Sequence, residues 1–384
     1  MKLEIDQLYR EHAPAITAAL AKAFGPARLD LIETAVQEAF VAAIEQWGDA
    51  PPDAPAAWLT TVARRKVIDA LRRAAWFAPG EPEEPLAEAS DTFGDEDLLA
   101  MMFVCCHPAL PVDASVPLAL RTLCGFSIAS LARALKTEPA ALEKRLGRAR
   151  QVLREQGVTF ERAGDVDAVL RTLYVLFFEG YVTSSAELCE TAIRLARLVP
   201  ESPAVHALLA LLLLSAARMP ARIDDAGDLV PLDRQDRARW DRAQIGEGFV
   251  QLAAAASGEA LTAYHLEASI AACHAMAADY AATDWPRIVG LYDRLLALAP
   301  SPVVALQRAI AIGRADGARA GLRALGQLAG DERLDDDPML AAAGAELKAQ
   351  LGDHAGARAA YRRALELAAS DAERRFLEAK LAAL

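Results

Sequence analysis

The sequence predicts an all-α protein. Its 384 residues are 54% hydrophobic and only 6% aromatic, and alanine and leucine dominate without long β-branched runs. Apolar residues recur three and four positions apart along much of the chain, which is the period of an amphipathic helix. A chain of this length has enough apolar residues for two or three separately packed domains.

Three or four helices are expected between residues 8 and 73. Residues 8–24 read as one amphipathic helix, which ends at Gly25 and Pro26. Residues 29–47 read as a second helix, and a proline-rich loop over 49–55 precedes a third. The second helix is expected to bury Leu31, Ala35, Val36, Ala39, Phe40, Ala43 and Ile44, and the third to turn Trp58, Leu59, Val62, Ile68 and Leu71 inward.

The third helix carries a cluster of basic residues with a surplus of four positive charges after Asp69 is counted. Such a cluster attracts phosphate groups, although an ordinary solvated helix has the same composition. Its basic members are Arg64, Arg65, Lys66, Arg72 and Arg73.

An acidic, proline-rich stretch follows and is expected to be a flexible linker. Between Pro79 and Asp97 there are eight acidic residues and no Lys or Arg. Pro82, Pro85 and Gly80 also preclude a continuous helix. The stretch separates two helical domains.

Residues 126–155 predict a helix, a tight turn and a second helix. Ser127 is placed to cap the first helix, and Pro139 suits the first turn of the second. The segment has seven basic and three acidic residues in a chain of net charge −12. A basic helix in an acidic protein indicates DNA binding, with a solvated helical hairpin as the alternative. Leu142, Leu146, Ala149 and Leu153 form the expected buried stripe, while Lys144, Arg145, Arg148, Gln151 and Arg154 project elsewhere.

The remainder of the chain reads as helical hairpins without a basic stripe. Residues 1–163 carry 18 basic and 23 acidic residues, which leaves −7 of the net charge for the rest. Residues 285–325 and 340–377 carry the Gly/Asp turns and the small–large alternation of tetratricopeptide-like repeats. We expect this part to act through protein contact, with Trp285, Tyr292, Leu295, Tyr361 and Leu365 in one continuous interior.

Other chemistries find little support in the sequence. The five cysteines are odd in number and lie in apolar contexts, which favours buried thiols, and Cys105, Cys106 and His107 are interpreted as core and turn residues rather than metal ligands. No catalytic residue, metal or cofactor is expected, and the protein is predicted not to be an enzyme. The acidic N-terminus is unlike a signal peptide and no apolar stretch is long enough to span a membrane, so a cytoplasmic location is predicted.

Three stretches resemble the extracytoplasmic-function sigma factors, the small members of the sigma-70 family. LDLIETAVQEAFVAAIEQW (29–47) resembles their helix that docks on the clamp helices of RNA polymerase, and PAAWLTTVARRKVIDALRR (55–73) their helix that melts and reads the −10 element. Residues 126–155 resemble the helix-turn-helix that reads the −35 element. There Leu142 stands at a buried valine position, and Arg145, Leu146, Arg148, Ala149 and Arg150 match the family pattern.

The resemblance implies the site residues. Polymerase contacts are expected from Glu33, Gln37 and Glu38. Contacts at the −10 element are expected from Trp58, Thr61, Arg64, Arg65, Lys66, Asp69, Arg72 and Arg73. Contacts at the −35 element are expected from Thr137, Ala141, Lys144, Arg145, Arg148 and Gln151.

The later segments TLYVLFFEGY, HALLALLLLSAARMPAR, DRQDRARWDRAQIGEG and AYHLEASIAACHA resemble the extension of the sigma subgroup with a tetratricopeptide-like C-terminal domain. The implied domains are 1–75 (region 2), 76–97 (linker), 98–160 (region 4) and 161–384 (helical repeats). The implied function is promoter-directed transcription initiation, with core RNA polymerase, promoter DNA and a protein bound by the repeats as partners, and no membrane. The alternatives are a one-component DNA-binding regulator with a sensing repeat domain and a repeat scaffold, which a pull-down with core polymerase would distinguish.

Overall fold

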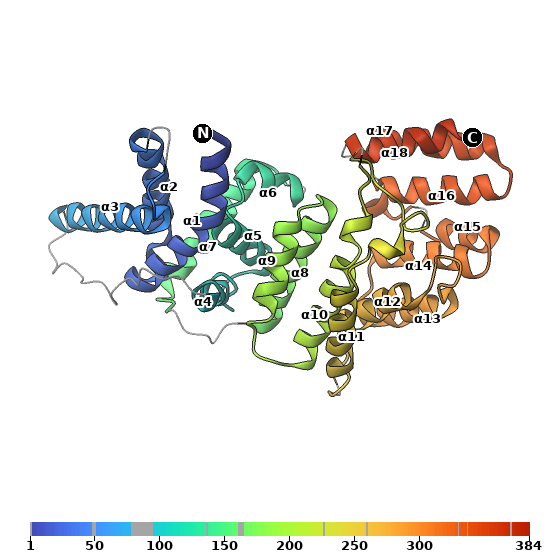
Figure 1. The fold of residues 1–384 in the computed structure, drawn as a ribbon, viewed down its shortest axis with the longest axis horizontal. Coiled ribbons are helices and arrows are strands. Elements are labelled where there is room, and N and C mark those ends of the chain that lie inside the picture. Colours follow the sequence, from blue (N-terminus) through green and yellow to red (C-terminus); the bar gives the residue numbers. More distant parts are fainter. Residues whose placement is uncertain are drawn as a thin grey trace. The chain divides into compact units, whose positions relative to one another are not determined.

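The computed structural model describes residues 2–47, 51–77, 95–135, 137–159, 165–225, 227–258, 260–328, 330–335, 337–368 and 371–384. Within these residues the chain forms eighteen α-helices and no strand beyond an isolated antiparallel bridge between Ile223 and Leu229, which confirms the all-α prediction. Figure 1 shows how the helices follow one another along the chain. Its internal packing divides the chain into two compact units, Met1–Val199 and Pro200–Leu384.

The first three helices follow the predicted pattern. They are α1 (Lys2–Phe24), α2 (Leu29–Gln46) and α3 (Pro55–Phe77), with a short 3-10 helix at Pro26–Arg28. Gly25 has a φ of 87°, a left-handed conformation that ends α1. The expected burial of Ile44 in α2 is wrong, because the buried stripe runs through Val36, Phe40 and Ala43 and leaves Ile44 50% exposed on the next face. Helix α3 buries Leu59, Ala63 and Val67, while Trp58, Val62, Ile68 and Leu71 are half-buried.

Most of the expected linker, residues 76–97, lies outside the described residues, and its two ends are helical. Helix α3 ends at Phe77 and the next described residue is Asp95, where α4 begins.

A second group of helices contains the predicted helix-turn-helix. It consists of α4 (Asp95–Cys105), α5 (Val112–Cys124), α6 (Ile128–Ala134) and α7 (Pro139–Glu155). The Ser127 hydroxyl accepts a hydrogen bond from the Ser130 amide at 3.1 Å, so the predicted cap is confirmed. The predicted stripe on α7 is confirmed, since Leu142, Leu146, Ala149 and Leu153 are the buried residues of this helix.

The next two helices, α8 (Val166–Val182) and α9 (Ala186–Ala196), belong to the first unit. Helix α8 packs on α4 and α5 and buries Leu173, Leu176 and Phe177 completely. The Thr172 hydroxyl lies 3.4 Å from the Cys106 sulfur. Helix α8 therefore belongs to the same compact unit as α4 and α5, and this unit extends beyond residue 160 to Val199.

The second unit is a succession of helices, most of which pack chiefly on their neighbours in sequence. They are α10 (Pro203–Ala216), α11 (Arg242–Ala255), α12 (Ala263–Met276), α13 (Trp285–Leu298), α14 (Pro302–Ala315), α15 (Ala318–Gly326), α16 (Pro338–Gln350), α17 (His354–Leu367) and α18 (Asp371–Ala382). The predicted glycine turns are confirmed, because Gly317 and Gly352 have φ values of 90° and 81°.

One expectation about the second unit is wrong. Leu295 lies in one hydrophobic cluster with Trp285 and Tyr292 packed against it, whereas Tyr361 lies in a separate cluster with Leu365. A further cluster around Leu306, Leu325 and Leu347 involves the helices between them. Because each helical hairpin contacts mainly its neighbours, the interior divides into successive clusters instead of one continuous core.

One segment of the second unit, Pro203–Ala221, is long and apolar enough to cross a membrane, contrary to the expectation from the sequence. Of its most apolar 18 residues, 72% are buried inside the protein. Leu214, Ala217 and Ala221 pack with Trp240 in a hydrophobic cluster. This burial is typical of the core helix of a water-soluble protein.

A close approach of two glycines offers a test of the packing in the second unit. A Cβ at Gly321 would lie 2.7 Å from the Gly313 Cα and 2.9 Å from the Leu347 side chain. We expect Gly321→Ala to destabilise the protein by about 1–3 kcal/mol, because α14 and α15 would have to move apart. Gly344→Ala is the matched control, since a Cβ there meets nothing within 4 Å and alanine stabilises a helix interior. Denaturant unfolding that gave both variants equal stability would contradict this packing.

Candidate nucleic-acid and polymerase interface

Helix α7, the predicted recognition helix, presents a groove lined by basic side chains. The groove has a volume of about 680 Å³. Lys144, Arg145 and Arg148 line it from one side, and Pro111 and Asp113 at the start of α5 line the other. Because these three cationic side chains line one groove, they can neutralise phosphates or donate hydrogen bonds to base edges.

Asp113 fixes one of these side chains. Its carboxylate lies 3.4 Å from the Arg145 Nε, and its backbone carbonyl accepts a hydrogen bond from the same guanidinium, also at 3.4 Å. Arg145 is therefore half-buried, whereas Lys144 and Arg148 are exposed. Sequence reasoning missed Asp113, which occupies the first turn of α5, distant from α7 in sequence.

The other predicted −35 residues differ in position. Ala141 is exposed and lines the groove, whereas Thr137 and Gln151 are not among its lining residues. Gln151 donates a hydrogen bond to Glu155 at 2.7 Å along the exposed side of α7. The structure thus brings four of the six predicted −35 residues together.

The predicted −10 residues lie along α3 at different depths. Thr61, Arg65, Asp69, Arg72 and Arg73 are exposed, and Trp58, Arg64 and Lys66 are half-buried. The Trp58 ring packs edge-on against Trp47 with the ring centroids 5.3 Å apart. A partly exposed aromatic ring beside exposed cations is suited to an unstacked base and its phosphates.

The predicted polymerase residues do not share one environment. Gln37 and Glu38 are exposed on α2, and the Glu38 carboxylate pairs with Lys66 of α3 at 2.9 Å. Glu33, one turn earlier, has a side chain only 14% exposed. It is turned toward the helix-turn-helix, and so it lies apart from the exposed pair.

Glu33 belongs to a set of charged residues that joins α2 to α7, which we call the α2–α7 ion-pair cluster: Asp30, Glu33, Arg150 and Arg154. The Arg150 guanidinium lies 2.5 Å from Glu33 and 3.1 Å from Asp30, and Arg154 lies 2.9 Å from Asp30. The sequence contained one signal of this cluster. The two acids are three residues apart and the two arginines four apart, so each pair lies on one helix face.

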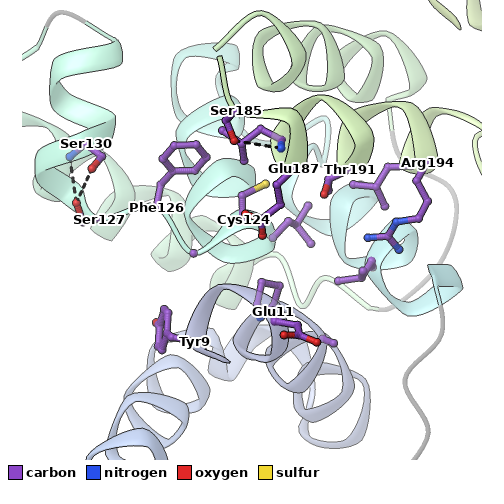
Figure 2. Close-up of a pocket in the computed structure, with 17 residues that line it drawn as sticks. Tyr9, Glu11, Cys124, Phe126, Ser127, Ser130, Ser185, Glu187, Thr191 and Arg194 are labelled. Atoms are coloured by element: carbon purple, nitrogen blue, oxygen red, sulfur yellow. Dashed lines mark hydrogen bonds between the residues drawn. The ribbon is translucent and has the colours of Figure 1, made fainter. Parts of the chain in front are cut away.

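A pocket of about 690 Å³ lies where α1, the α5–α6 turn and α9 meet, and Figure 2 shows its lining. Tyr9 and Glu11 of α1 face Phe126 and the α9 residues Glu187 and Arg194 across it. Cys124 also lines the pocket, and burial raises the pKa of its thiol to about 12. This thiol is therefore protonated at neutral pH and is a poor nucleophile.

No group of three or more His, Cys, Asp or Glu side chains is placed to hold a metal ion in the described part of the chain. Cys105 and Cys106 are fully buried in α4 and in the turn that follows, and His107 accepts a hydrogen bond from the Ala109 amide at 3.2 Å. The interpretation of these three residues as core and turn residues is confirmed.

Comparisons with known proteins agree with the N-terminal geometry. The sigma-70 region 2 family matches residues 8–77, which contain most of α1 and all of α2 and α3. A family of unknown function, DUF6596, matches residues 165–256. An uncharacterised protein of Rhizobium meliloti (strain 1021) is 37% identical over 381 residues, covering 92% of this chain and 90% of the relative.

The Rhizobium meliloti protein aligns with nearly the whole chain, and so its similarity to this chain is not limited to the region 2 residues. The region 2 match falls on the helices that carry Glu38, Lys66 and Trp58. The chain therefore belongs to the same family as the Rhizobium meliloti protein, and its N-terminal sigma-70 region 2 domain supports a sigma-70 family member with a role in transcription initiation.

Proposed function

We propose that this chain binds core RNA polymerase and directs it to specific promoters as an extracytoplasmic-function type sigma factor. The observation that carries the proposal is the coexistence of two separate basic elements, α3 inside the region 2 match and the α7 groove outside it. A one-component regulator needs a helix-turn-helix, but it has no need of a second element suited to opened DNA strands.

In this proposal the protein performs no chemistry of its own. The α7 groove contacts duplex at the −35 element, with Arg145 oriented by Asp113 and with the exposed Lys144 and Arg148 reaching phosphates or bases. The cationic face of α3 contacts the strand that is opened at the −10 element. Polymerase holds both contacts at a fixed spacing, and this spacing adds to the specificity.

We infer that the helices of the second unit form tetratricopeptide-like repeats that regulate or assist initiation through protein contact. Three features support this: the sequential hairpins, the glycine turns at Gly317 and Gly352, and the close approach of two glycines between α14 and α15. The sequence after residue 163 also lacks the cationic surplus that DNA binding needs, because it carries −7 of the net charge.

The polymerase contact is tested by Gln37→Ala combined with Glu38→Lys. We expect this variant to bind labelled core polymerase at least tenfold more weakly, because a contact and a charge on the exposed face of α2 are altered. Its fold should persist, since the Glu38–Lys66 pair lies at the surface and contributes about 0–1 kcal/mol. Glu190→Lys on the exposed face of α9 is the control with the same charge change. Unchanged affinity in a titration of core enzyme would leave the polymerase assignment without support.

A further inference from the structure

We propose that a pocket in the second unit binds a small amphipathic monocarboxylate, with the apolar body of the ligand inside the pocket and its carboxylate on Arg314. The pocket has a volume of about 380 Å³ and is lined by α14, α16, α17, α18 and residues 231–233; we call it the repeat pocket. The proposal goes beyond the proposed function and does not depend on it, because ligand binding is measured without polymerase or DNA.

The repeat pocket lies where two hydrophobic clusters of the second unit meet. Ile310 and Leu347 of its lining pack in the cluster around Leu306, whereas Tyr361 and Phe376 pack in the next cluster along the chain. The two clusters therefore leave a pocket between them. Small ligands occupy pockets of about 300–1,000 Å³. A volume of about 380 Å³ gives room for roughly a dozen water-sized groups.

The lining of the repeat pocket is suited to an apolar ligand body. Of its thirteen residues, four are charged and nine are apolar or aromatic. Ala342 and Ala343 leave space along α16, because their side chains are short. Met339 at the start of α16 is 47% exposed, so it lies at the rim of the pocket. An apolar molecule that enters would exchange contact with water for contact with these side chains.

Two of the four charged residues neutralise each other. The Lys380 Nζ lies 2.9 Å from the Glu346 carboxylate, which also accepts a hydrogen bond from the Tyr361 hydroxyl at 3.0 Å. Burial alone would raise the pKa of the Glu346 carboxyl, but the hydrogen bond and the charge of Lys380 outweigh it and hold this pKa below its usual value. This pair is therefore complete without a ligand.

Arg314 is the cation that remains for a ligand. Its guanidinium lies over the Tyr280 ring, 5.6 Å from the centroid, and no carboxylate among the described residues forms an ion pair with it. A guanidinium stacked on an aromatic ring keeps its N–H groups in its own plane, where a carboxylate accepts two of them. An apolar pocket with one such cation fits a ligand that combines an apolar body with a carboxylate.

Asp233 limits the charge of that ligand. It is exposed and lines the same pocket as Arg314. A ligand with several negative charges would be repelled by Asp233 as well as attracted by Arg314, and so a single carboxylate is favoured. Removing the Asp233 charge should therefore strengthen binding, whereas removing the Arg314 charge should weaken it.

The first test compares three head groups on one apolar body. Decanoate is the probe, because its roughly twelve non-hydrogen atoms match the space in the pocket. Titration calorimetry of the full chain should show saturable binding of one decanoate per chain. Decan-1-ol and decyltrimethylammonium should bind at least tenfold more weakly, because neither offers a carboxylate to Arg314. No saturable binding of decanoate, or equally tight binding of the cationic probe, would overturn the proposal.

The second test removes the charges. Arg314→Gln should weaken decanoate binding at least tenfold, whereas Asp233→Asn should strengthen it by about two- to fivefold. Arg323→Gln makes the same change as the first variant at an exposed position of α15 outside the pocket, and it should have no effect. Circular dichroism verifies that each variant is folded. A folded Arg314→Gln variant that binds decanoate as tightly as the parent would overturn the assigned role of Arg314.

The third test places the ligand in the repeat pocket and holds even if Arg314→Gln fails to fold. Ala343→Leu fills part of the pocket and should weaken binding at least tenfold, with Ala359→Leu at an exposed position of α17 as the control. In the parent chain, decanoate should shift the methyl resonance of Met339, one of six methionines, which Met339→Leu identifies by its loss. Saturable binding that leaves this resonance unchanged and is insensitive to Ala343→Leu would place the ligand elsewhere and overturn the proposal.

Discussion

Replacing both Arg145 and Arg148 by alanine is expected to abolish transcription from the cognate promoter and to leave binding to core polymerase unchanged. Both guanidiniums line the α7 groove, and neither belongs to the buried stripe of that helix. A bidentate base contact contributes about 1–3 kcal/mol, and removing one phosphate-binding cation should lower the slope of log affinity against log salt by about one. The two substitutions together would weaken the −35 interaction by a factor of hundreds or more.

The measurement is in vitro transcription alongside a titration of core enzyme, with affinity for promoter DNA followed over a range of salt concentrations. Arg154→Ala on the same helix is the control, because Arg154 faces Asp30 and is not among the groove residues. A double variant that initiates as strongly as the parent would mean that α7 is not the recognition helix. Loss of core binding in the same variant would mean that the two functions are not separate.

Local periodicity was sufficient to predict the helices and most of their buried faces. The stripe on α7 and the cap at Ser127 depend on residues within one or two turns, so spacing alone identified them. The same applies to the groove cations Lys144, Arg145 and Arg148, which lie off that stripe. The prediction that Ile44 is buried was wrong, because hydrophobicity alone does not specify which side of a helix faces the core. The face next to the buried stripe also carries an exposed apolar residue, Val41.

Contacts between distant segments could not be predicted in this way. The position of Glu33 against Arg150 depends on how the region 2 helices pack on the later ones, and no local pattern contains this information. Asp113 beside Arg145 is a second example. Nothing in the neighbouring sequence distinguishes Glu33 or Asp113 from other acidic residues, and only the tertiary arrangement pairs each of them with an arginine.

Because α8 packs within the first unit, the stability of a shortened chain is expected to depend strongly on whether it keeps this helix. A fragment that ends at Val199 should fold, whereas one that ends at Arg162 should be insoluble or strongly destabilised. The shorter fragment lacks α8, which contributes Leu173, Leu176 and Phe177 to the first unit, all with no exposed surface. Burying three such side chains stabilises a protein by roughly 5–8 kcal/mol, which is comparable to the whole stability of many domains.

Thermal unfolding and sedimentation of fragments 1–162 and 1–199 would test this, with the full chain for comparison. Part of the buried area belongs to the surfaces of α4 and α5 that α8 covers, so the shorter fragment would expose apolar surface and aggregate. A soluble 1–162 fragment with an undiminished unfolding temperature would contradict the assignment of α8 to the first unit.

The 1–199 fragment then isolates the effect of the second unit, because it keeps α2, α3 and the α7 groove. If it initiates with the strength and promoter choice of the full chain, residues 200–384 have no regulatory role under those conditions, and a changed output would measure their contribution.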